Sequence, residues 1–247
     1  MKDWVKGRVV AKRQWNHRLY SMQLDAPVEG FKAGQFTQVA LDIGEERVGR
    51  PYSLVNPPQE RPLEIYFNAV PEGPLTPRLS DLNPGDEVWI TAKASGVFTL
   101  DAMPAARDLW LIATGTALGV YLSILRTADP WERFERIFLV HGVRSSDELT
   151  YGDTIGALRD VHGERFGFIP VLSREHREGI LHGRIPPLLE SGGLEGRAGA
   201  AIEAEHSHLM LCGQAEMIKE VRAFLEARGM RQHRRNEPGH YTSEQYH

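Results

Sequence analysis

The sequence has little that would cross-link it or hold it in a membrane. Its 247 residues include one cysteine, Cys212. A lone cysteine can form neither an internal disulfide nor a cysteine-cluster metal site, which favours a reducing compartment. Residues 1–6 lack the apolar core of a signal peptide. No apolar run approaches the roughly 18 residues that a membrane-spanning helix needs. These absences predict a cytoplasmic protein.

An excess of positive charge is also missing. Lys and Arg number 29 against 33 Asp and Glu, a net charge of −4 with neutral His. Nucleic-acid-binding domains usually carry a basic excess, so a general nucleic-acid binder is disfavoured. The ten histidines are scattered, and no Ser-His-Asp or metal-ligand pattern is visible. We therefore predict neither a catalytic triad nor a metal site.

The first hundred residues read as short strands separated by turn residues such as Asn83-Pro84-Gly85-Asp86. This succession predicts a closed or partly closed antiparallel β-barrel. One helix is expected over residues 76–82, with Thr76 as its cap and Pro77 at its first position. The expected strands are residues 8–11, 19–24, 35–41, 63–70 and 87–91.

After about residue 105 the pattern changes to fully apolar runs that alternate with helical stretches, which is typical of a parallel α/β sheet. The fold class is therefore an antiparallel β-barrel, residues 1–100, followed by a parallel α/β domain, residues 101–247. Residues 191–207 are expected to form a loop. The expected strands are 109–113, 137–140, 166–172 and 209–212, and the expected helices are 119–126, 153–162, 185–190 and 215–228.

The segment Arg50-Pro51-Tyr52-Ser53 lies between the expected strands 35–41 and 63–70. It offers a fixed cation, a rigid ring, a flat aromatic ring and a hydroxyl. Such a set could hold a phosphate, stack on a planar ring and donate a hydrogen bond to it. Short motifs of this kind also occur by chance, so the rest of the chain must decide between the two interpretations.

In open α/β sheets, ligands bind at the carboxyl ends of the strands. The Gly-rich segment 113–119 follows one such end, and its backbone could approach a phosphate, although a plain strand-to-helix turn is the alternative. Arg144, Arg174 and Arg184 each lie near a strand end. Together they could bind the 2′-phosphate of a dinucleotide, whereas each alone could be a solvated surface charge. Cys212, before Gly213, could pack as a small apolar residue or lie close to a reacting nicotinamide.

Taken in order along the whole chain, these motifs resemble the ferredoxin/flavodoxin–NADP reductase family, and in particular its compact bacterial branch. Arg50-Pro51-Tyr52-Ser53 matches the family's Arg-x-Tyr-Ser flavin motif. Gly73-Pro74-Leu75-Thr76 lies where the second FAD segment is expected. Residues 113–119, Ala-Thr-Gly-Thr-Ala-Leu-Gly, resemble the nicotinamide loop, and Leu211-Cys212-Gly213 resembles the Cys-Gly motif near the flavin.

The resemblance implies FAD and NADP(H) as cofactors. Arg50 would pair with the FAD pyrophosphate, Tyr52 would stack on the isoalloxazine ring, and Ser53 would donate toward its N5 atom. Ser53, Tyr52 and Cys212 are implied as the catalytic residues, which set donor–acceptor distance and access. The other implied cofactor-binding residues are Pro51, Tyr66, Phe67, Asn68, Pro74, Leu75 and Thr76 for FAD, and Thr116, Arg144, Ser173, Arg174, Arg184, Gln214, Ala215 and Glu216 for NADP(H).

The end of the chain departs from the branch, which often ends in Tyr-Trp. Here the last residues are Tyr246 and His247. The resemblance implies that they lie near the FAD adenine, but His247 offers a smaller stacking face than tryptophan. The conformation of the FAD is left open.

The implied activity is electron transfer between NADPH and ferredoxin or flavodoxin, with hydride passing to flavin N5. A basic run, Arg228, Arg231, Arg234 and Arg235, could steer an acidic carrier, and a solvated helix end is an equal alternative. Two other functions stay open: a reductase component that feeds an oxygenase, and a flavin-binding redox regulatory subunit. A monomer is the simplest expectation.

Overall fold

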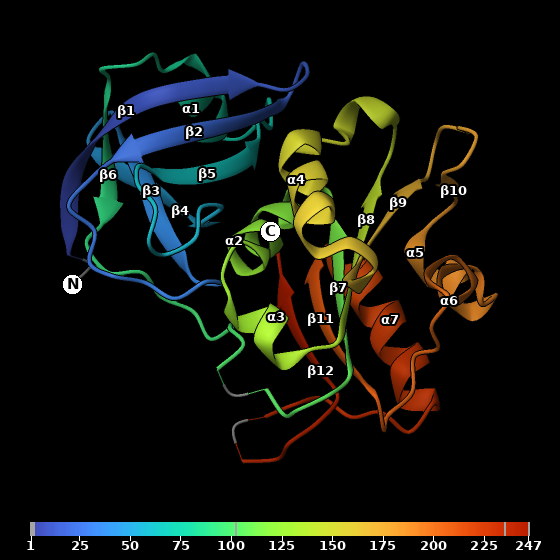
Figure 1. Cartoon of the computed structure of the whole chain (residues 1–247). Helices are drawn as coiled ribbons and strands as arrows, with labels where there is room; N and C mark the ends of the chain where they lie inside the picture. Colours follow the sequence, from blue (N-terminus) through green and yellow to red (C-terminus); the bar gives the residue numbers. More distant parts are fainter. Residues whose placement is uncertain (1–2, 102, 235, 247) are drawn as a thin grey trace. The chain divides into compact units, whose positions relative to one another are not determined.

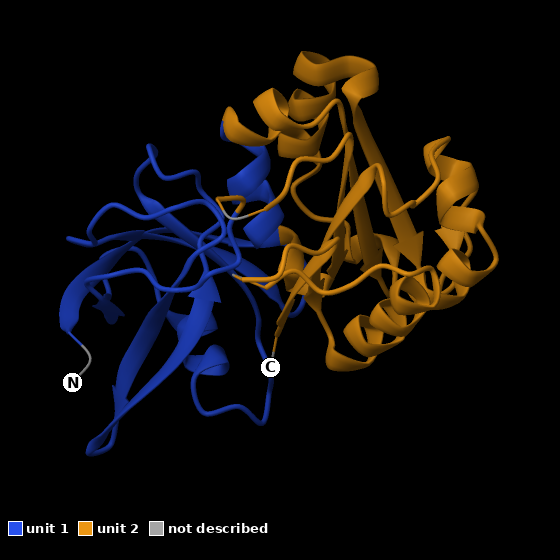
Figure 2. Cartoon of the chain, turned by 90° about the horizontal axis from the view of Figure 1, so that it is seen from below, with its two compact units in different colours: residues 1–99, 119–127 blue, residues 100–118, 128–247 orange. Residues whose placement is uncertain are grey.

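The computed structural model describes residues 3–101, 103–234 and 236–246, and it forms two compact units (Figures 1 and 2). Unit 1 runs to Thr99 and also takes in Gly119–Thr127. Unit 2 comprises Leu100–Leu118 and the chain from Ala128 on. Within the described residues, no helix is long and apolar enough to cross a membrane.

Unit 1 is built on a six-stranded sheet in which neighbouring strands are antiparallel, in the order β4-β3-β6-β1-β2-β5. Its two edge strands meet where Leu54 forms an antiparallel bridge with Ile65 and the Val55 N–H donates to the Glu64 carbonyl at 2.9 Å. The sheet thus curls into the partly closed barrel that the sequence predicts. Its elements are β1 (Trp4–Gln14), β2 (Leu19–Asp25), β3 (Phe36–Ile43), β4 (Glu46–Ser53), β5 (Leu63–Asn68), α1 (Thr76–Asp81) and β6 (Glu87–Thr91).

Two details of this unit differ from the sequence prediction. Arg50–Ser53 is not a connection between strands but the end of a separate strand, β4. Its residues are largely polar, so the sequence gives no strand pattern there. Thr76 does not cap α1, because Leu75 precedes the helix and contributes no side-chain cap. The Thr76 hydroxyl oxygen instead accepts a hydrogen bond from the Val70 N–H at 2.9 Å, which fixes the turn after β5.

The helix α2 (Leu118–Leu125) continues the chain after β7, yet Gly119–Thr127 packs with unit 1. The Ser123 hydroxyl donates to the Asn56 carbonyl at 2.9 Å, and Arg126 forms an ion pair with Glu60. Gly119 packs closely there, because a Cβ atom at this position would lie 3.1 Å from the Val55 side chain. The segment Gly119–Thr127 is thereby fastened to the barrel by polar and apolar contacts.

Unit 2 is built on a parallel six-stranded sheet in the order β10-β9-β8-β7-β11-β12. The strands β7, β8 and β11, which are buried along almost their whole length, lie at its centre, where both faces are covered. Helices α5, α6 and α7 pack on one face, and α3 and α4 lie on the other (Figure 1). The elements are β7 (Asp108–Thr114), α3 (Asp129–Arg133), β8 (Arg136–Val143), α4 (Gly152–His162), β9 (Phe166–Leu172), β10 (Leu181–His182), α5 (Ile185–Glu190), α6 (Gly193–Ala198), β11 (Ser207–Gly213), α7 (Ala215–Ala227) and β12 (Tyr241–Gln245).

The predicted loop 191–207 is wrong in part, because its residues Gly193–Ala198 form α6. The carboxylate of Glu195 on this helix accepts hydrogen bonds from the Ile202 N–H at 2.7 Å and from both terminal nitrogens of Arg228 at 2.7 and 3.0 Å. Arg228 is thereby engaged within the fold instead of free for a partner. Arg235 of the same predicted basic run lies outside the described residues.

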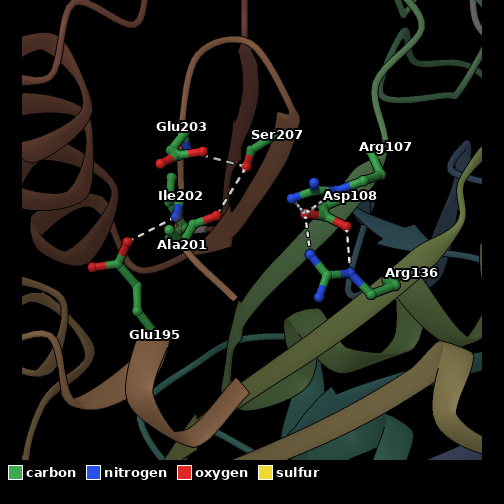
Figure 3. Close-up of polar contacts among 8 residues, drawn as sticks. All are labelled: Arg107, Asp108, Arg136, Glu195, Ala201, Ile202, Glu203 and Ser207. Carbon is green, nitrogen blue, oxygen red and sulfur yellow. Dashed lines mark hydrogen bonds and ion pairs between the residues drawn. The ribbon is translucent and has the colours of Figure 1, made fainter. Parts of the chain in front are cut away.

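The amino ends of the parallel strands are joined by a buried carboxylate (Figure 3). Asp108 opens β7 and its side chain has no exposed surface. Its two oxygens accept hydrogen bonds from Arg136, at the start of β8, at 2.8 and 2.7 Å, and Arg107 adds two more at 3.2 and 2.9 Å. Burial would raise the pKa of Asp108, but the bonds from Arg136 and Arg107 outweigh it and lower the pKa. Any ligand site at the carboxyl ends is therefore at the other end of the sheet.

Candidate functional site

In unit 1 the predicted flavin residues lie on two strand segments that the barrel brings together. Tyr52 and Ser53 end β4 and are buried, and the next residue, Leu54, pairs with Ile65 of β5. Arg50 is exposed and donates to the Gly49 carbonyl at 2.9 Å, so its remaining N–H groups are available to an anion. The motif thus presents a cation at the surface and an aromatic ring and a hydroxyl beneath it.

The Tyr52 hydroxyl is buried and has no hydrogen-bond partner among the described residues. Burial, only partly opposed by the charge of Arg50, raises the pKa of Tyr52 well above its ordinary value, so the phenol is neutral. The buried side-chain oxygen of Asn68, at the end of β5, is also unpaired there. Unpaired buried polar atoms cost about 1–3 kcal/mol each, so a ligand that bonds to them recovers this energy. A polar ligand that reaches them can donate a hydrogen bond to either oxygen.

The other predicted FAD residues face different ways. Phe67 is 2% exposed and meets the Tyr52 ring edge-on at 6.1 Å between centroids, so it supports that ring within the core. Side chains alternate along a strand, and Tyr66 and Asn68 therefore lie on the opposite face of β5 from Phe67. The Leu75 side chain is also buried in the core, which leaves only its backbone for a ligand.

In unit 2 the parallel pairing places five residues in one row across the carboxyl ends of the strands. From the β12 edge inward the row reads Glu244, Cys212, Ala113, His141 and Pro170. The predicted nicotinamide loop leaves the sheet directly after this row, from Thr114. The central strands thus bring Cys212 and the loop together, as the sequence predicts.

The loop after β7 is braced from both neighbouring strands. The Thr114 hydroxyl oxygen accepts a hydrogen bond from the Gln214 N–H at 2.9 Å. Gly213 has φ +137°, and a Cβ atom there would lie 2.0 Å from this oxygen, so only glycine fits. On the other side, His141 Nε2 lies 2.9 Å from the Gly115 carbonyl oxygen. Burial lowers the pKa of His141 to about 4, so the ring is neutral and donates this bond. The two braces hold Thr114 and Gly115, directly before Thr116.

Cys212 and Glu244 lie side by side in this row, and sequence reasoning missed Glu244. Burial, and secondly the charge of Glu244, raise the pKa of the Cys212 thiol well above its usual range, although a hydrogen bond with Tyr246 partly offsets this. The thiol is therefore protonated at neutral pH. Burial also raises the pKa of Glu244 to about 7. The pair is thus a neutral thiol beside a carboxyl that can hold or release a proton at neutral pH.

The three predicted arginines lie next to one another on the outer part of the same edge. The Arg174 N–H donates to the Arg144 carbonyl at 2.9 Å, and Gly183, just before Arg184, donates to Leu172 at 2.9 Å. The Arg144 guanidinium is held by Glu148 at 3.0 Å and that of Arg184 by Glu220 at 3.0 Å. The Arg174 guanidinium is exposed and makes no hydrogen bond or ion pair within the described ranges. It is therefore the cation most open to an incoming phosphate.

The remaining predicted residues are also placed. Ser173 donates its hydroxyl to the Val143 carbonyl at 3.2 Å. Gln214, Ala215 and Glu216 are exposed at the start of α7. Tyr246 continues β12 and donates its N–H to the Gly213 carbonyl at 2.9 Å, while His247 lies outside the described residues.

Comparison with known proteins agrees with this geometry. Residues 8–97 match the oxidoreductase FAD-binding domain family and residues 111–223 match the oxidoreductase NAD-binding domain family. The flavodoxin/ferredoxin–NADP reductase of Escherichia coli strain K12 is 44% identical over 247 residues, which is all of both chains. The chain belongs to this reductase family. Its family, its enzyme class and its FAD and NADP(H) cofactors are as the sequence predicts.

Two further relatives support the assignment of this reductase. The ferredoxin–NADP reductase of Pseudomonas aeruginosa is 34% identical over 255 residues, covering 99% of this chain and 98% of the relative. The crystal structure of a ferredoxin NADP⁺ reductase from Neisseria gonorrhoeae with bound FAD and NADP matches with a TM-score of 0.93 at 27% identity, covering 99% of each chain. These two matches therefore include both the barrel and the parallel sheet of the reductase.

Proposed function

We propose that this reductase takes hydride from NADPH onto FAD and passes single electrons to ferredoxin or flavodoxin, in the cytoplasm. Its full-length relatives are named flavodoxin/ferredoxin–NADP reductases, which supports this carrier class. The structural observation that carries the proposal is the Arg50-Pro51-Tyr52-Ser53 segment, with its exposed cation and its buried, unpaired Tyr52 hydroxyl. We further propose residues 1–100 as the FAD-binding domain and 101–247 as the NADP(H)-binding domain.

The residues of this chain bind FAD and orient it. Bound FAD supplies the redox chemistry, because its ring accepts two electrons as hydride and returns them singly. Arg50 and the backbone of the turn at Pro74–Thr76 hold the FAD pyrophosphate, Tyr52 and Ser53 hold the ring, and Tyr66 and Asn68 lie along it. Pro51 keeps the end of β4 rigid, and Tyr246 lies near the adenine.

The NADP(H) residues divide the carboxyl edge of unit 2 into two parts. Thr116 and Cys212 border the nicotinamide, because Cys212 pairs with Ala113 directly before the loop that carries Thr116. Arg144, Arg174 and Arg184 bind the 2′-phosphate, with Ser173 between them in the chain. Gln214, Ala215 and Glu216 border the adenosine side. Glu244 holds or releases a proton next to Cys212.

The purified protein should be yellow and should release FAD on heating. In stopped-flow mixing, NADPH should bleach the flavin absorbance much faster than NADH, and ferredoxin or flavodoxin should restore it. Release of FMN, or a colourless protein that does not bind FAD, would contradict the cofactor assignment. Reduction of dyes without reduction of either carrier would point instead to the oxygenase-reductase alternative, and no turnover at all would point to a regulatory subunit.

Replacement of Glu244 by Gln should stabilise the protein above neutral pH. A carboxyl whose pKa is raised to about 7 binds a proton more tightly in the folded state, so wild-type stability falls as pH rises from about 4.5 to 7. Because the group is partly solvated, we expect E244Q to gain about 1–2 kcal/mol at pH 8 and little at pH 4.5. Urea unfolding at both pH values measures this, with exposed Glu164→Gln as the control. An equal effect at both pH values would contradict the assignment.

A further inference from the structure

His141 is a fully buried histidine that is held at one of its two ring nitrogens. It lies in β8, in the row of residues at the carboxyl ends of the parallel strands, where it pairs with Ala113 of β7. Nε2 lies 2.9 Å from the Gly115 carbonyl oxygen, and because a carbonyl only accepts, Nε2 carries the proton. Nδ1 is buried and has no hydrogen-bond partner among the described residues.

The unpaired Nδ1 argues against proton transfer through His141. A group that passes a proton needs a partner within hydrogen-bond reach on the side that takes the proton up and on the side that gives it away. An unpaired buried nitrogen also disfavours the folded state, a cost that an apolar side chain of similar size would avoid. What histidine contributes at this position is therefore the N–H that reaches Gly115.

The turn that receives this bond is not fixed by packing. Gly115 has φ +56°, a conformation that glycine adopts without steric cost. A Cβ atom added to Gly115 would meet nothing in the surrounding chain within 4 Å, so the turn is open on that side. Hydrogen bonds must hold it instead. The Leu118 N–H donates to the same carbonyl from within the turn, and His141 adds a donor from a buried strand of the sheet.

The Gly115 carbonyl and the Thr116 N–H belong to one planar trans peptide group, in which they point in opposite directions. The bond from His141 therefore also sets the direction of the Thr116 N–H. We infer that His141 is a positioning residue for hydride transfer, because it orients the peptide group that joins Gly115 to Thr116, beside the nicotinamide. The inference rests on the proposed function, which places the nicotinamide at this loop.

The test compares H141Q with H141N, because the two amide side chains differ in reach. The Gln amide nitrogen can lie about where Nε2 lies, whereas the shorter Asn amide reaches only about as far as Nδ1. Stopped-flow reduction of the FAD-loaded protein by increasing NADPH gives a limiting rate and a half-saturating concentration. H141N should lower the limiting rate about tenfold and H141Q less than about threefold. The half-saturating concentration should change less than about twofold in both, because the arginines proposed to bind the 2′-phosphate are untouched.

His208 provides the matched control. It is also buried, near the amino end of β11, and its Nε2 also lacks a hydrogen-bond partner in the part of the chain that the structure describes. H208N thus makes the same substitution at the opposite end of the sheet, and it should keep the limiting rate within about twofold of wild type. Rates are compared per molecule of bound FAD, so an unfolded fraction does not affect them.

Three results would overturn the inference. They are a limiting rate for H141N equal to that of wild type, equal slowing by H141Q and H141N, and equal slowing by H141N and H208N. A change confined to the half-saturating concentration would also overturn it, since His141 would then affect nucleotide binding alone. If NADPH failed to reduce the wild-type flavin, the proposed function itself would fail. The wild-type measurement therefore distinguishes the two failures.

Discussion

The triple variant R144A/R174A/R184A should lose the preference for NADPH over NADH, with kcat/KM for NADPH reduced by about a thousandfold and that for NADH nearly unchanged. The reason is that only NADPH carries the 2′-phosphate, and each arginine can give it a charge-assisted hydrogen bond worth at least about 1.5 kcal/mol. Steady-state dye reduction with both nucleotides measures the ratio.

The single variants refine this expectation, because the three arginines differ in their present partners. Arg144 and Arg184 already bind Glu148 and Glu220, whereas the Arg174 guanidinium has no partner within the described residues. R174A should therefore reduce NADPH affinity without leaving a carboxylate that has lost its ion-pair partner. Exposed Arg159 on α4, replaced by Ala, is the control and should leave the nucleotide preference intact. Unchanged discrimination in the triple variant would refute the 2′-phosphate assignment.

Replacement of Asp108 by Asn should lower the free energy of unfolding by about 2–3 kcal/mol at pH 7. The Asp108 side chain has no exposed surface and accepts bonds from both Arg107 and Arg136, so its loss leaves two cations without their counter-ion. The Arg107 and Arg136 side chains are 37% and 33% exposed and can be partly hydrated, which keeps the loss below that of a fully buried pair. Urea unfolding monitored by circular dichroism measures the change.

The pH dependence of this loss has a defined sign. The folded-state pKa of Asp108 is lowered, so its contribution to stability is present above about pH 4 and disappears as pH falls further. The difference in the free energy of unfolding between wild type and D108N should therefore become smaller at acidic pH. Asp129→Asn, which removes the exposed partner of Arg133 at 3.5 Å, is the matched control and should cost less than about 0.5 kcal/mol. If D108N and D129N lost the same free energy of unfolding, Asp108 would not be the buried counter-ion that stabilises this end of the sheet.

The sequence predicts the fold class and most elements because apolar runs determine them. The central strands β7, β8 and β11 contain the apolar runs 109–113, 137–140 and 209–212, and a sheet covered on both faces buries such runs. The short α3 and β10 escaped prediction, and so did three elements with weak patterns. β12 reads Tyr-Thr-Ser-Glu-Gln, β4 is largely polar, and α6 is a six-residue helix that contains two glycines. Their conformation is set by neighbours that lie far away in the sequence.

The same distinction applies to the candidate site. Motif residues such as Arg50, Tyr52 and Cys212 are visible because their types and order are characteristic. Glu244 is not, since a carboxyl in a polar segment gives no sign that β12 will pair with β11 and bury it beside Cys212. The loop braces from His141 and Gln214 are also invisible, because each depends on the register between strands.

The packing of Gly119–Thr127 with the barrel limits how this protein can be divided and recombined. A gene fragment that encodes residues 1–100 would omit Gly119, Ser123 and Arg126, and with them the contacts to Val55, Asn56 and Glu60. The barrel is thus not an independently transferable module. A chimaera with another reductase must exchange two separate stretches of chain, or keep the segment Gly119–Thr127 from the same parent as the barrel that it completes.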